Sequence, residues 1–565
     1  MNKSSLALAL GLIMAVCGNA HAAKVSLLNL DPGGVGLNDT TPAAPVGANP
    51  GATVGDQRRI AYEFAADLWG AVLKSDQEIK VYASFAPLTC TATGAVLGSA
   101  GTNWIVFNFP GADPDVLYHS ALGDAIAGED LVPDPADPGD IASQFNANLG
   151  QTGCLEGSGW YYGLDGKTPA GKINFLNVVM HEIGHGLGFS GFVSKTSGAL
   201  LAGLPDVYTR VAYDNQQNLR FTDPAMTNAL RAVSMRTPGR TVWDGGTVNS
   251  QAALLLDDAV LLRASGSLTR DFEYGLASFG PTVTTANFSG AVALANDGVG
   301  PDTADACEAL PAGSLAGKIA YTNRGTCGFE LKAVNAQNAG AIGVLIGNVA
   351  TSGNPGIAPG MADDPTLTAG VPTLSLNLAD ADALKAALPG VNVSLGVVPG
   401  RLAGADSSGR AQLYSPLTVA TGSTFSHFDT PVSPNALMEP FITDTLNAQY
   451  TVDLTAALFK DIGWSLNGGN ALIGQCRTNV PVLQTAGIII GANIAAQDAL
   501  CESSTNPAQP QQYLGCMLDH AKTLRKQNLL SAKQANSVIA CSLDSTLRKI
   551  FDLYNVKTVS TAGAK

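Results

Sequence analysis

The sequence predicts an α+β protein in which one domain is split by an inserted α/β module and is followed by a small helical module that contains disulfides. Three observations support this prediction. The motif His-Glu-x-x-His at 181–185 follows an apolar run typical of a buried helix. Between 262 and 401 the composition changes to Gly, Ala and Val, with short alternating strands. Four of the nine cysteines lie after residue 467, which is typical of a small module held by disulfides.

The motif has the spacing of a metal-binding helix. Residues four apart lie on one helix face, so His181 and His185 can place two imidazole nitrogens on one ion while Glu182 reaches a water on that ion. The preceding run, 173–180, is apolar enough to bury the helix, which argues against a pair of surface histidines. The sequence therefore predicts a zinc site that still needs a third ligand.

Length and charge limit the classes of protein to consider. A chain of 565 residues is too long for a single hydrophobic core. With about 150 residues per domain, three or four domains are expected. The net charge of −14, from 32 basic and 46 acidic residues, argues against nucleic acid and anionic membranes as partners. No run of about 20 apolar residues follows the amino terminus, so no membrane span is expected.

The first 22 residues are typical of a secretory signal peptide. Lys3 supplies the charged start, 6–16 is apolar, and Ala20-His21-Ala22 matches a small-x-small cleavage site. Cys17 offers the alternative of a lipoprotein anchor, although the residues before it fit lipid attachment poorly. We therefore expect a secreted protein, extracellular or periplasmic in transit.

Eight cysteines remain without Cys17, and an even number in an exported chain favours disulfides over free thiols. Each predicted part of the chain contains an even number of them. They are Cys90 and Cys154 in the first part, Cys307 and Cys327 in the insert, and Cys476, Cys501, Cys516 and Cys541 in the last. The pairing among the last four stays open.

The part from 23 to 261 has the order strand, helix, strands and then the motif helix. The predicted elements are a strand at 25–30, a helix around 60–72, strands at 79–85 and 104–107, and an edge strand at 140–148. This order resembles the amino-terminal half of zincin peptidases. The resemblance implies that the edge strand binds extended peptide by strand addition.

The insert, 262–401, resembles a protease-associated (PA) domain. Its strand and Arg-Gly-x-Cys-x-Phe turn at 317–329 lead into a helix at 332–341 and an apolar strand at 342–346, and 371–388 matches the closing half of that family. The resemblance implies a module without catalytic groups, which shapes substrate access or binds partners.

The third metal ligand does not directly follow the helix. In metzincins it is the last histidine of His-Glu-x-x-His-x-x-Gly-x-x-His, but that position is Gly191 here, and glycine has no side chain to bind metal. His119, His427 and His520 remain, and a carboxylate could also serve.

A second resemblance favours His427. The segments Ser426-His427-x-Asp429, Leu437-Met438 and 454–464, together with the motif helix, resemble the leishmanolysin-like metallopeptidases. The resemblance implies that His427 is the third ligand, that Met438 forms the supporting methionine turn, and that 402–466 is the second part of the catalytic domain. This chain departs from that group by carrying a PA domain between the second and third ligands, and His119 is the alternative ligand.

These residues predict a secreted zinc endopeptidase that acts on proteins or peptides. One catalytic Zn²⁺ held by three neutral imidazoles supplies an activated water, and Glu182 acts as the general base. One alternative is a binding or adhesion protein on a zincin scaffold that uses the PA domain. Another is an exopeptidase, because PA domains also accompany aminopeptidases. Tyr450 could stabilise the oxyanion or simply pack.

The last part, 467–565, predicts a helical module. Its predicted helical segments are 483–490, 513–527 and 531–541. Lysines and arginines near its end make it locally basic, which favours a solvated helical face. No function is predicted for it.

Overall fold

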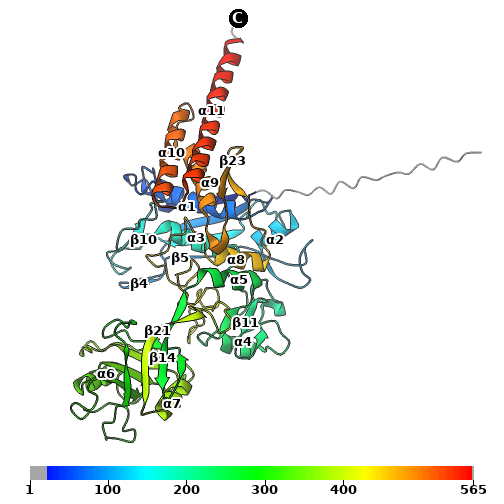
Figure 1. The fold of residues 1–565 in the computed structure, drawn as a ribbon. Helices are drawn as coiled ribbons and strands as arrows, with labels where there is room; N and C mark the ends of the chain where they lie inside the picture. Colours follow the sequence, from blue (N-terminus) through cyan, green and yellow to red (C-terminus); the bar gives the residue numbers. More distant parts are fainter. Residues whose placement is uncertain (1–21, 563–565) are drawn as a thin grey trace, which may run out of the picture. The chain divides into compact units, whose positions relative to one another are not determined.

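The computed structural model describes residues 22–562 (Figure 1). The proposed signal peptide lies outside the described residues, apart from its last residue, Ala22. The described chain divides into two units. The first comprises the chain up to Val193, Leu200–Val211 and the chain from Ala436 onward, and the second comprises Ser194–Ala199 and Ala212–Asn435.

A four-stranded sheet lies at the centre of the first unit. Its order is β1 (Val25–Asn29), β2 (Ile79–Ala86), β8 (Ile141–Asn146) and β5 (Gly98–Thr102). The first three strands are parallel, and β5 is antiparallel to β8.

The predicted edge strand at 140–148 is therefore wrong in position, because β8 lies between two strands and β5 forms the edge. Ile141, Ser143 and Phe145 are buried, whereas Ala142 and Gln144 are exposed. This alternation shows that one face of the sheet is buried, and it does not distinguish an edge strand from a central one. The sequence of β5, Gly-Ser-Ala-Gly-Thr, has no apolar pattern that could have marked it as a strand.

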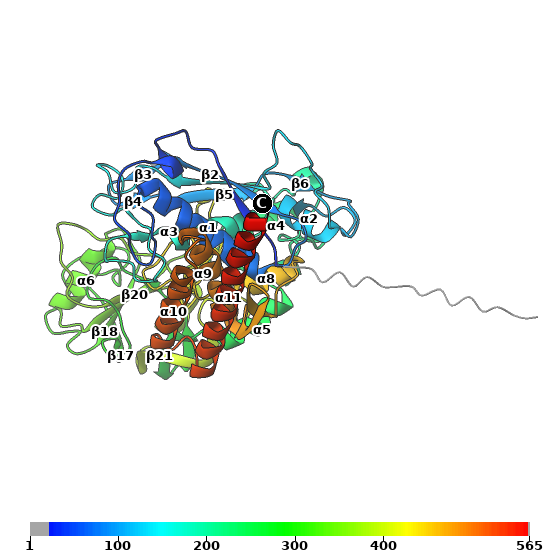
Figure 2. The same cartoon turned by 90° about the horizontal axis from the view of Figure 1, so that it is seen from above.

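Two helices pack on this sheet (Figure 2). The first, α1 (Val54–Val72), begins with a capping box in which Thr53 and Asp56 bond each other's backbone N–H. It contacts β1, while α3 (Phe175–Gly186) contacts β5 and β8, and the two helices contact each other. The predicted strand at 104–107 is only the two-residue β6 (Ile105–Val106), paired with β7 (Tyr118–His119) ahead of α2 (Ser120–Ala127).

The second unit contains an eight-stranded sheet with a parallel centre, β17-β18-β19-β20. Alternate residues of its central strands enter different cores: Ala320 and Val344 pack with α6, whereas Tyr321 and Leu345 pack with α7. The helices therefore cover opposite faces, and the predicted α/β insert is confirmed. In sheet order the strands are β15 (Arg270–Phe272), β14 (Asp258–Gly266), β21 (Val391–Leu402), β17 (Ser289–Leu294), β18 (Ile319–Asn323), β19 (Gly343–Gly347), β20 (Thr373–Leu376) and β16 (Gly275–Leu276), and the helices are α6 (Phe329–Asn338) and α7 (Leu378–Ala386).

A smaller sheet also belongs to this unit. Its order is β12 (Leu219–Arg220), β11 (Ala212–Asp214) and β13 (Thr241–Trp243), with α4 (Asn228–Ser234) and α5 (Gly246–Leu255) nearby in the chain. The buried side chain of Arg240 pairs with Asp214 at 2.8 Å inside this region.

The carboxy-terminal part is mainly helical, as predicted, but it begins with an unexpected hairpin, β22 (Asn470–Ile473) and β23 (Cys476–Pro481). The predicted helix at 483–490 is wrong. Ala486 and Gly487 adopt left-handed conformations there, so α9 begins only at Ile490. The helices of this part are α9 (Ile490–Ser504), α10 (Pro510–Lys526) and α11 (Ala532–Ala562), and α8 (Thr455–Ile462) precedes it in the chain.

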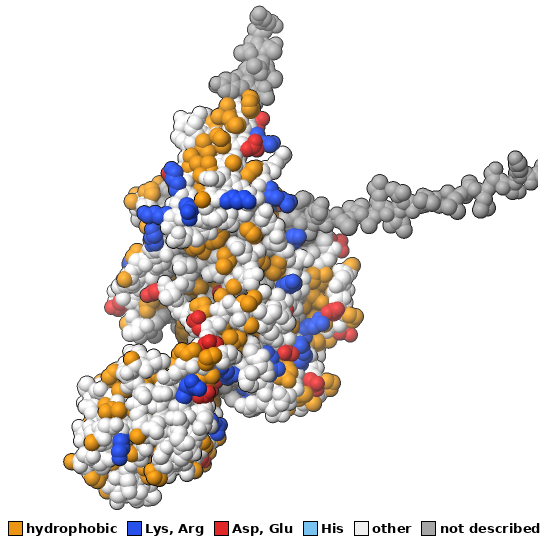
Figure 3. Space-filling model, in the orientation of Figure 1, with side chains coloured by type: hydrophobic (Ala, Val, Ile, Leu, Met, Phe, Trp, Pro, Cys, Tyr) orange, Lys and Arg blue, Asp and Glu red, His pale blue; other side chains and the backbone are white. Residues whose placement is uncertain are grey.

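Basic side chains gather over the lower part of α10 and α11, and apolar ones lie along α11 above them (Figure 3). The exposed apolar residues there include Leu543, Leu547 and Phe551. Among residues 22–562, no helix is long and apolar enough to cross a membrane.

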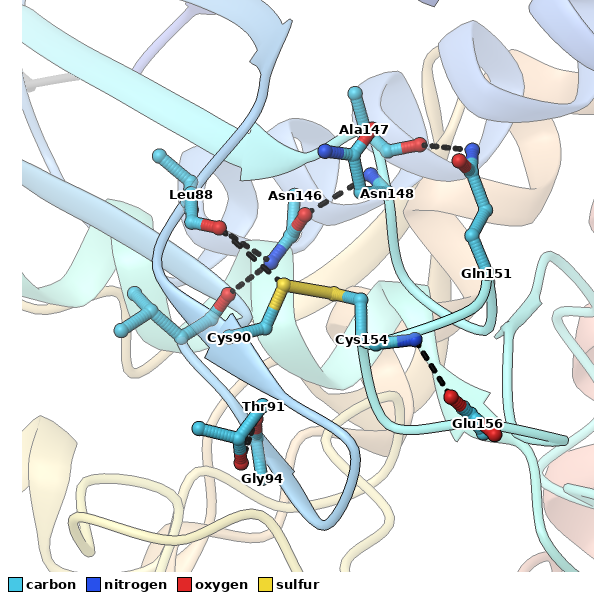
Figure 4. Close-up of a disulfide and its surroundings, with 12 residues drawn as sticks. Leu88, Cys90, Thr91, Gly94, Asn146, Ala147, Asn148, Gln151, Cys154 and Glu156 are labelled. Atoms are coloured by element: carbon cyan, nitrogen blue, oxygen red, sulfur yellow. Dashed lines mark hydrogen bonds between the residues drawn. A yellow bond between two sulfur atoms is a disulfide. The ribbon is translucent and has the colours of Figure 1, made fainter.

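Four disulfides join cysteines of the same predicted part. Cys90–Cys154 ties the loop after β8 to the hairpin before β5, beside Asn146 (Figure 4). The Asn146 side chain donates to the carbonyl of Val96 at 2.8 Å, which adds a second link to that hairpin. The others are Cys307–Cys327, Cys476–Cys541 and Cys501–Cys516, and the last two supply the pairing that the sequence left open.

Candidate metal centre

The motif helix α3 is held at several points along its length. Every one of its twelve residues is buried, as the apolar run predicted. Its Asn174 side chain caps the first turn by accepting from the Asn177 N–H. The indole N–H of Trp69 donates to the Met180 carbonyl at 3.0 Å, and that of Trp464 donates to the Leu187 carbonyl at 2.8 Å. These bonds fix the position from which the motif side chains project.

The two histidines of the motif point their ring nitrogens at each other. Nδ1 of His181 lies 2.7 Å from the Leu437 carbonyl oxygen, and Nδ1 of His185 lies 2.9 Å from that of Phe189. A carbonyl oxygen can only accept, so both Nδ1 atoms carry the proton and both Nε2 atoms carry a lone pair. These Nε2 atoms are 3.1 Å apart.

Two facing lone pairs repel each other unless a cation lies between them. Two nitrogens bound to one tetrahedral zinc at about 2.0–2.1 Å are about 3.3–3.4 Å apart, close to the separation of His181 and His185. Burial also lowers the pKa of His181 to about 4, which keeps its imidazole neutral. The donor pair therefore fits a zinc ion.

His427 shows the same pattern within the second unit. Its ring is buried, and its Nδ1 lies 2.8 Å from the Ser423 carbonyl oxygen. A carbonyl on Nδ1 directs Nε2 to a metal, as is usual for metal-binding histidines. His427 is therefore a candidate ligand in the second unit, as His181 and His185 are in the first.

The other two histidines that the sequence left as candidates make different contacts. Nε2 of His119 lies 2.9 Å from the Ser190 hydroxyl, and the ring packs on Phe192. Nε2 of His520, on α10, lies 2.8 Å from the Asn493 side-chain oxygen. Both contacts are typical of structural histidines.

The turn around Met438 packs directly against the motif helix. A Cβ atom on Gly184 would lie 2.9 Å from the Met438 sulfur, so glycine at this position lets the methionine approach between the two histidines. The residue before it, Leu437, is held from its other side because its N–H donates to Asp453 at 2.6 Å. Asp453 is buried, and burial raises the pKa of its carboxyl to about 6. The sequence predicted Met438, but it carried no signal for Asp453.

Glu182 lies beneath the edge strand. Its carboxyl is buried, and burial raises its pKa to about 8. A Cβ atom on Gly98 of β5 would lie only 2.7 Å from Glu182 Oε1, so the strand backbone passes directly over the carboxyl. Sequence reasoning missed Gly98, because nothing in its local pattern distinguishes it from a loop glycine.

The side chain of Tyr450 contacts Gln527 rather than a residue of the motif helix. Its hydroxyl donates to the Gln527 side chain at 3.2 Å, at the end of α10. This bond supports the packing role that the sequence offered as the alternative to oxyanion stabilisation.

The described chain resembles solved peptidase structures over limited segments. A zinc aminopeptidase from Bacillus subtilis is 24% identical over 27% of this chain and 37% of its own, with a TM-score of 0.18. A peptidase M28 precursor from Shewanella amazonensis is 19% identical over 27% of this chain and 40% of its own, with a TM-score of 0.19. A subtilisin-like protease from an Antarctic Pseudoalteromonas is 22% identical over 25% of this chain and 34% of its own, with a TM-score of 0.19.

The chain thus spans well under half the length of these matched structures. No curated protein matches the chain. The family model of the PA domain matches residues 279–384, within the eight-stranded sheet and its two helices. This part of the chain is therefore a PA domain, as its sequence predicted.

Proposed function

We propose that the protein is a secreted zinc-dependent endopeptidase in which His181, His185 and His427 bind one zinc ion and Glu182 is the general base. The observation that carries the proposal is the pair of Nε2 atoms of His181 and His185, 3.1 Å apart with both Nδ1 atoms on carbonyl oxygens. The carbonyl contact of the His427 Nδ1 supports its role as the third ligand.

The side chains around His181 and His185 are suited to peptide hydrolysis. Zinc bound here would polarise a substrate carbonyl and lower the pKa of a water. Glu182 follows His181 directly, so it can accept a proton from that water and return it to the leaving amine. Burial raises the Glu182 pKa to about 8, and a nearby cation would lower it again, towards the ionised form that a base requires.

An endopeptidase is supported by the open edge of the sheet. As the edge strand, β5 presents unpaired backbone groups beside Glu182, and an extended peptide can pair with such a strand at any point along its length. Exopeptidase action would require a further element that binds a chain terminus. A purely adhesive protein would have no use for Glu182.

The proposed domain boundaries follow the ends of helices and strands. The signal peptide is 1–22, the catalytic domain comprises 23–261 and 402–466, the PA-containing insert is 262–401, and the helical module is 467–565. The large sheet begins with β14 at Asp258 and ends with β21 at Leu402, which supports the limits of the insert. The four disulfides support export to an oxidising compartment.

The test compares the purified mature protein with two variants. We expect the parent to contain zinc by mass spectrometry and to cleave casein or gelatin. Glu182→Ala should keep the zinc and lose at least about 100-fold in rate, and His427→Ala should lose both. Glu129→Ala, at an exposed position, is the matched control.

Each variant tests a separate part of the proposal. If Glu182→Ala cleaves casein as fast as the parent, the protein is not a peptidase of this kind. If His427→Ala keeps zinc and activity, the third ligand is another residue, and His119→Ala is the next variant to measure.

A further inference from the structure

The second unit contains a cavity of about 710 Å³, a size typical of ligand sites. One wall belongs to the eight-stranded sheet and its connections, with Glu273, Asn377 and Arg401. The facing wall belongs to the segment that leads to His427, with Gln412 and Asp429. A ligand in this cavity would therefore contact both the PA-containing insert and the segment of the proposed third ligand.

This facing wall is tied to His427 by backbone bonds. The Tyr414 N–H donates to the His427 carbonyl, and the Asp429 N–H donates to the Gln412 carbonyl, both at 2.9 Å. These two bonds form an antiparallel bridge centred on Leu413. This wall of the cavity is therefore hydrogen-bonded directly to the His427 segment.

The guanidinium group of Arg401 makes fewer hydrogen bonds than its N–H groups allow. Its Nη2 donates to Glu273 at 2.9 Å, but its Nη1 is buried and has no hydrogen-bond partner in the described structure. Leaving a buried N–H unpaired costs free energy. The Glu273 side chain is 65% exposed, so this ion pair contributes little and is easily exchanged.

The second arginine of the cavity, Arg410, is paired with carboxylates of the same unit. Arg410 donates to Asp406 through both Nε and Nη2, at 2.8 and 2.7 Å, and both side chains are largely buried. The Asp429 carboxylate accepts from the Thr430 N–H at 2.8 Å. Of the two arginines that line the cavity, Arg401 is the one with a buried N–H group that lacks a hydrogen-bond partner in the described structure.

The chemistry of Arg401 specifies the ligand. A planar guanidinium fork matches the paired oxygens of a carboxylate or a phosphate. The Asp429 carboxylate on the facing wall disfavours a doubly charged group such as phosphate. The matching ligand is therefore a single carboxylate.

We propose that Arg401 binds one carboxylate of the peptide substrate in this cavity, displacing Glu273, and so selects substrates that carry a carboxylate. This inference rests on the proposed peptidase function and names its substrate class. The carboxylate could belong to an aspartate or glutamate side chain or to the substrate's own carboxy terminus, and the experiment separates these two sources.

The test measures binding to the full-length mature Glu182→Ala protein, so that cleavage does not interfere. Short fluorescein-labelled peptides are titrated and followed by fluorescence anisotropy. One set carries a single glutamate, moved along the peptide, with an amidated end. A second carries glutamine instead, and a third carries glutamine with a free carboxy terminus. We expect one carboxylate set to bind at least about tenfold more tightly than the neutral set.

Three further substitutions, each made in the Glu182→Ala protein, test whether the preference for carboxylate peptides arises in the cavity. Arg401→Gln should remove the preference, and Glu273→Gln should strengthen it because Arg401 loses its present partner. Arg263→Gln is the matched control, since Arg263 forms an exposed ion pair with Asp271 on the same sheet, outside the cavity. It should leave the preference unchanged.

Equal binding of all three peptide sets would overturn the inference, as would a preference that survives Arg401→Gln. Because Glu273→Gln leaves Arg401 in place, it provides a test even if Arg401→Gln fails to fold. If the peptides bind equally while the parent cleaves casein, only the cavity assignment fails. If Arg401 controls binding in a parent that lacks zinc and activity, only the peptidase proposal fails.

Discussion

Nδ1 of His181 lies 2.7 Å from the carbonyl oxygen of Leu437, although the two residues are 256 positions apart in the chain. The bond fixes the His181 tautomer and turns its Nε2 towards His185. Leu437 is in turn held by Asp453, 2.6 Å from its N–H. The orientation of the first proposed ligand thus depends on a buried carboxylate that follows the methionine turn.

Replacing Asp453 should weaken zinc binding without removing a ligand. In Asp453→Ala the Leu437 N–H loses its acceptor, so the carbonyl that orients His181 becomes less fixed. We expect the zinc affinity, measured by competition with a chromophoric chelator, to fall about 10–100-fold. Asp444→Ala, at an exposed position of the same segment, should leave the affinity unchanged. Equal affinities for both variants would contradict this account of His181.

A single methyl group on the edge strand should reduce activity. In Gly98→Ala the new Cβ would lie 2.7 Å from Glu182 Oε1, so the carboxyl must move. We expect kcat/KM on a casein peptide to fall at least about tenfold, with zinc content unchanged. Gly101→Ala lies on the same strand and has no atom within 4 Å of its Cβ, so it should behave as the parent does. Similar losses in both variants would show that the strand, not Glu182, is disturbed.

The stability of the first unit should depend on the ionisation of Asp67. Burial, and secondarily the charge of Glu63, raises the Asp67 pKa from 3.8 to about 7. Since the unfolded chain loses this proton at lower pH, stability is lost as the pH rises from about 4 to about 7. Asp67→Asn should therefore raise the free energy of unfolding at pH 8 by on the order of 1 kcal/mol.

Denaturant unfolding between pH 4 and pH 8 measures this effect. The gain from Asp67→Asn should shrink towards pH 4, where the parent carboxyl is also neutral. Asp552→Asn, on the exposed face of α11, is the control and should show no such trend. A gain from Asp67→Asn that does not change with pH would mean that the titration of Asp67 is not its cause.

Loss of the Cys90–Cys154 disulfide should loosen the loop between β8 and β9 (Trp160–Tyr161). The bond joins residues 64 positions apart, and removing such a link typically costs about 2–4 kcal/mol. We expect Cys90→Ser/Cys154→Ser to be cut faster by proteinase K within 147–159, as identified by mass spectrometry. Cys307→Ser/Cys327→Ser should leave that cleavage rate unchanged, because its bond lies in the second unit.

Several features were predictable because their signals are local in the chain. His181, Glu182 and His185 lie on one helix whose preceding run is largely apolar, so their spacing and burial follow from helix geometry. The PA domain was recognisable because its strands and helices follow one another without interruption from 279 to 384. The first two disulfides followed from the distribution of cysteines, since each predicted part held one pair.

Other features depend on contacts between residues distant in sequence, and only the tertiary structure decided them. Gly98–Thr102 is the edge strand because its backbone pairs with β8, and a short run of small residues carries no side-chain pattern that reports such pairing. The bonds of Leu437 to His181 and Asp453, and the pairing of Cys476 with Cys541, likewise join distant segments. The sequence by itself thus determined which side chains can perform metal chemistry, because that depends on local spacing. The structure decided which backbone atoms orient them, because backbone groups are the same in every residue and are distinguished only by where the fold places them.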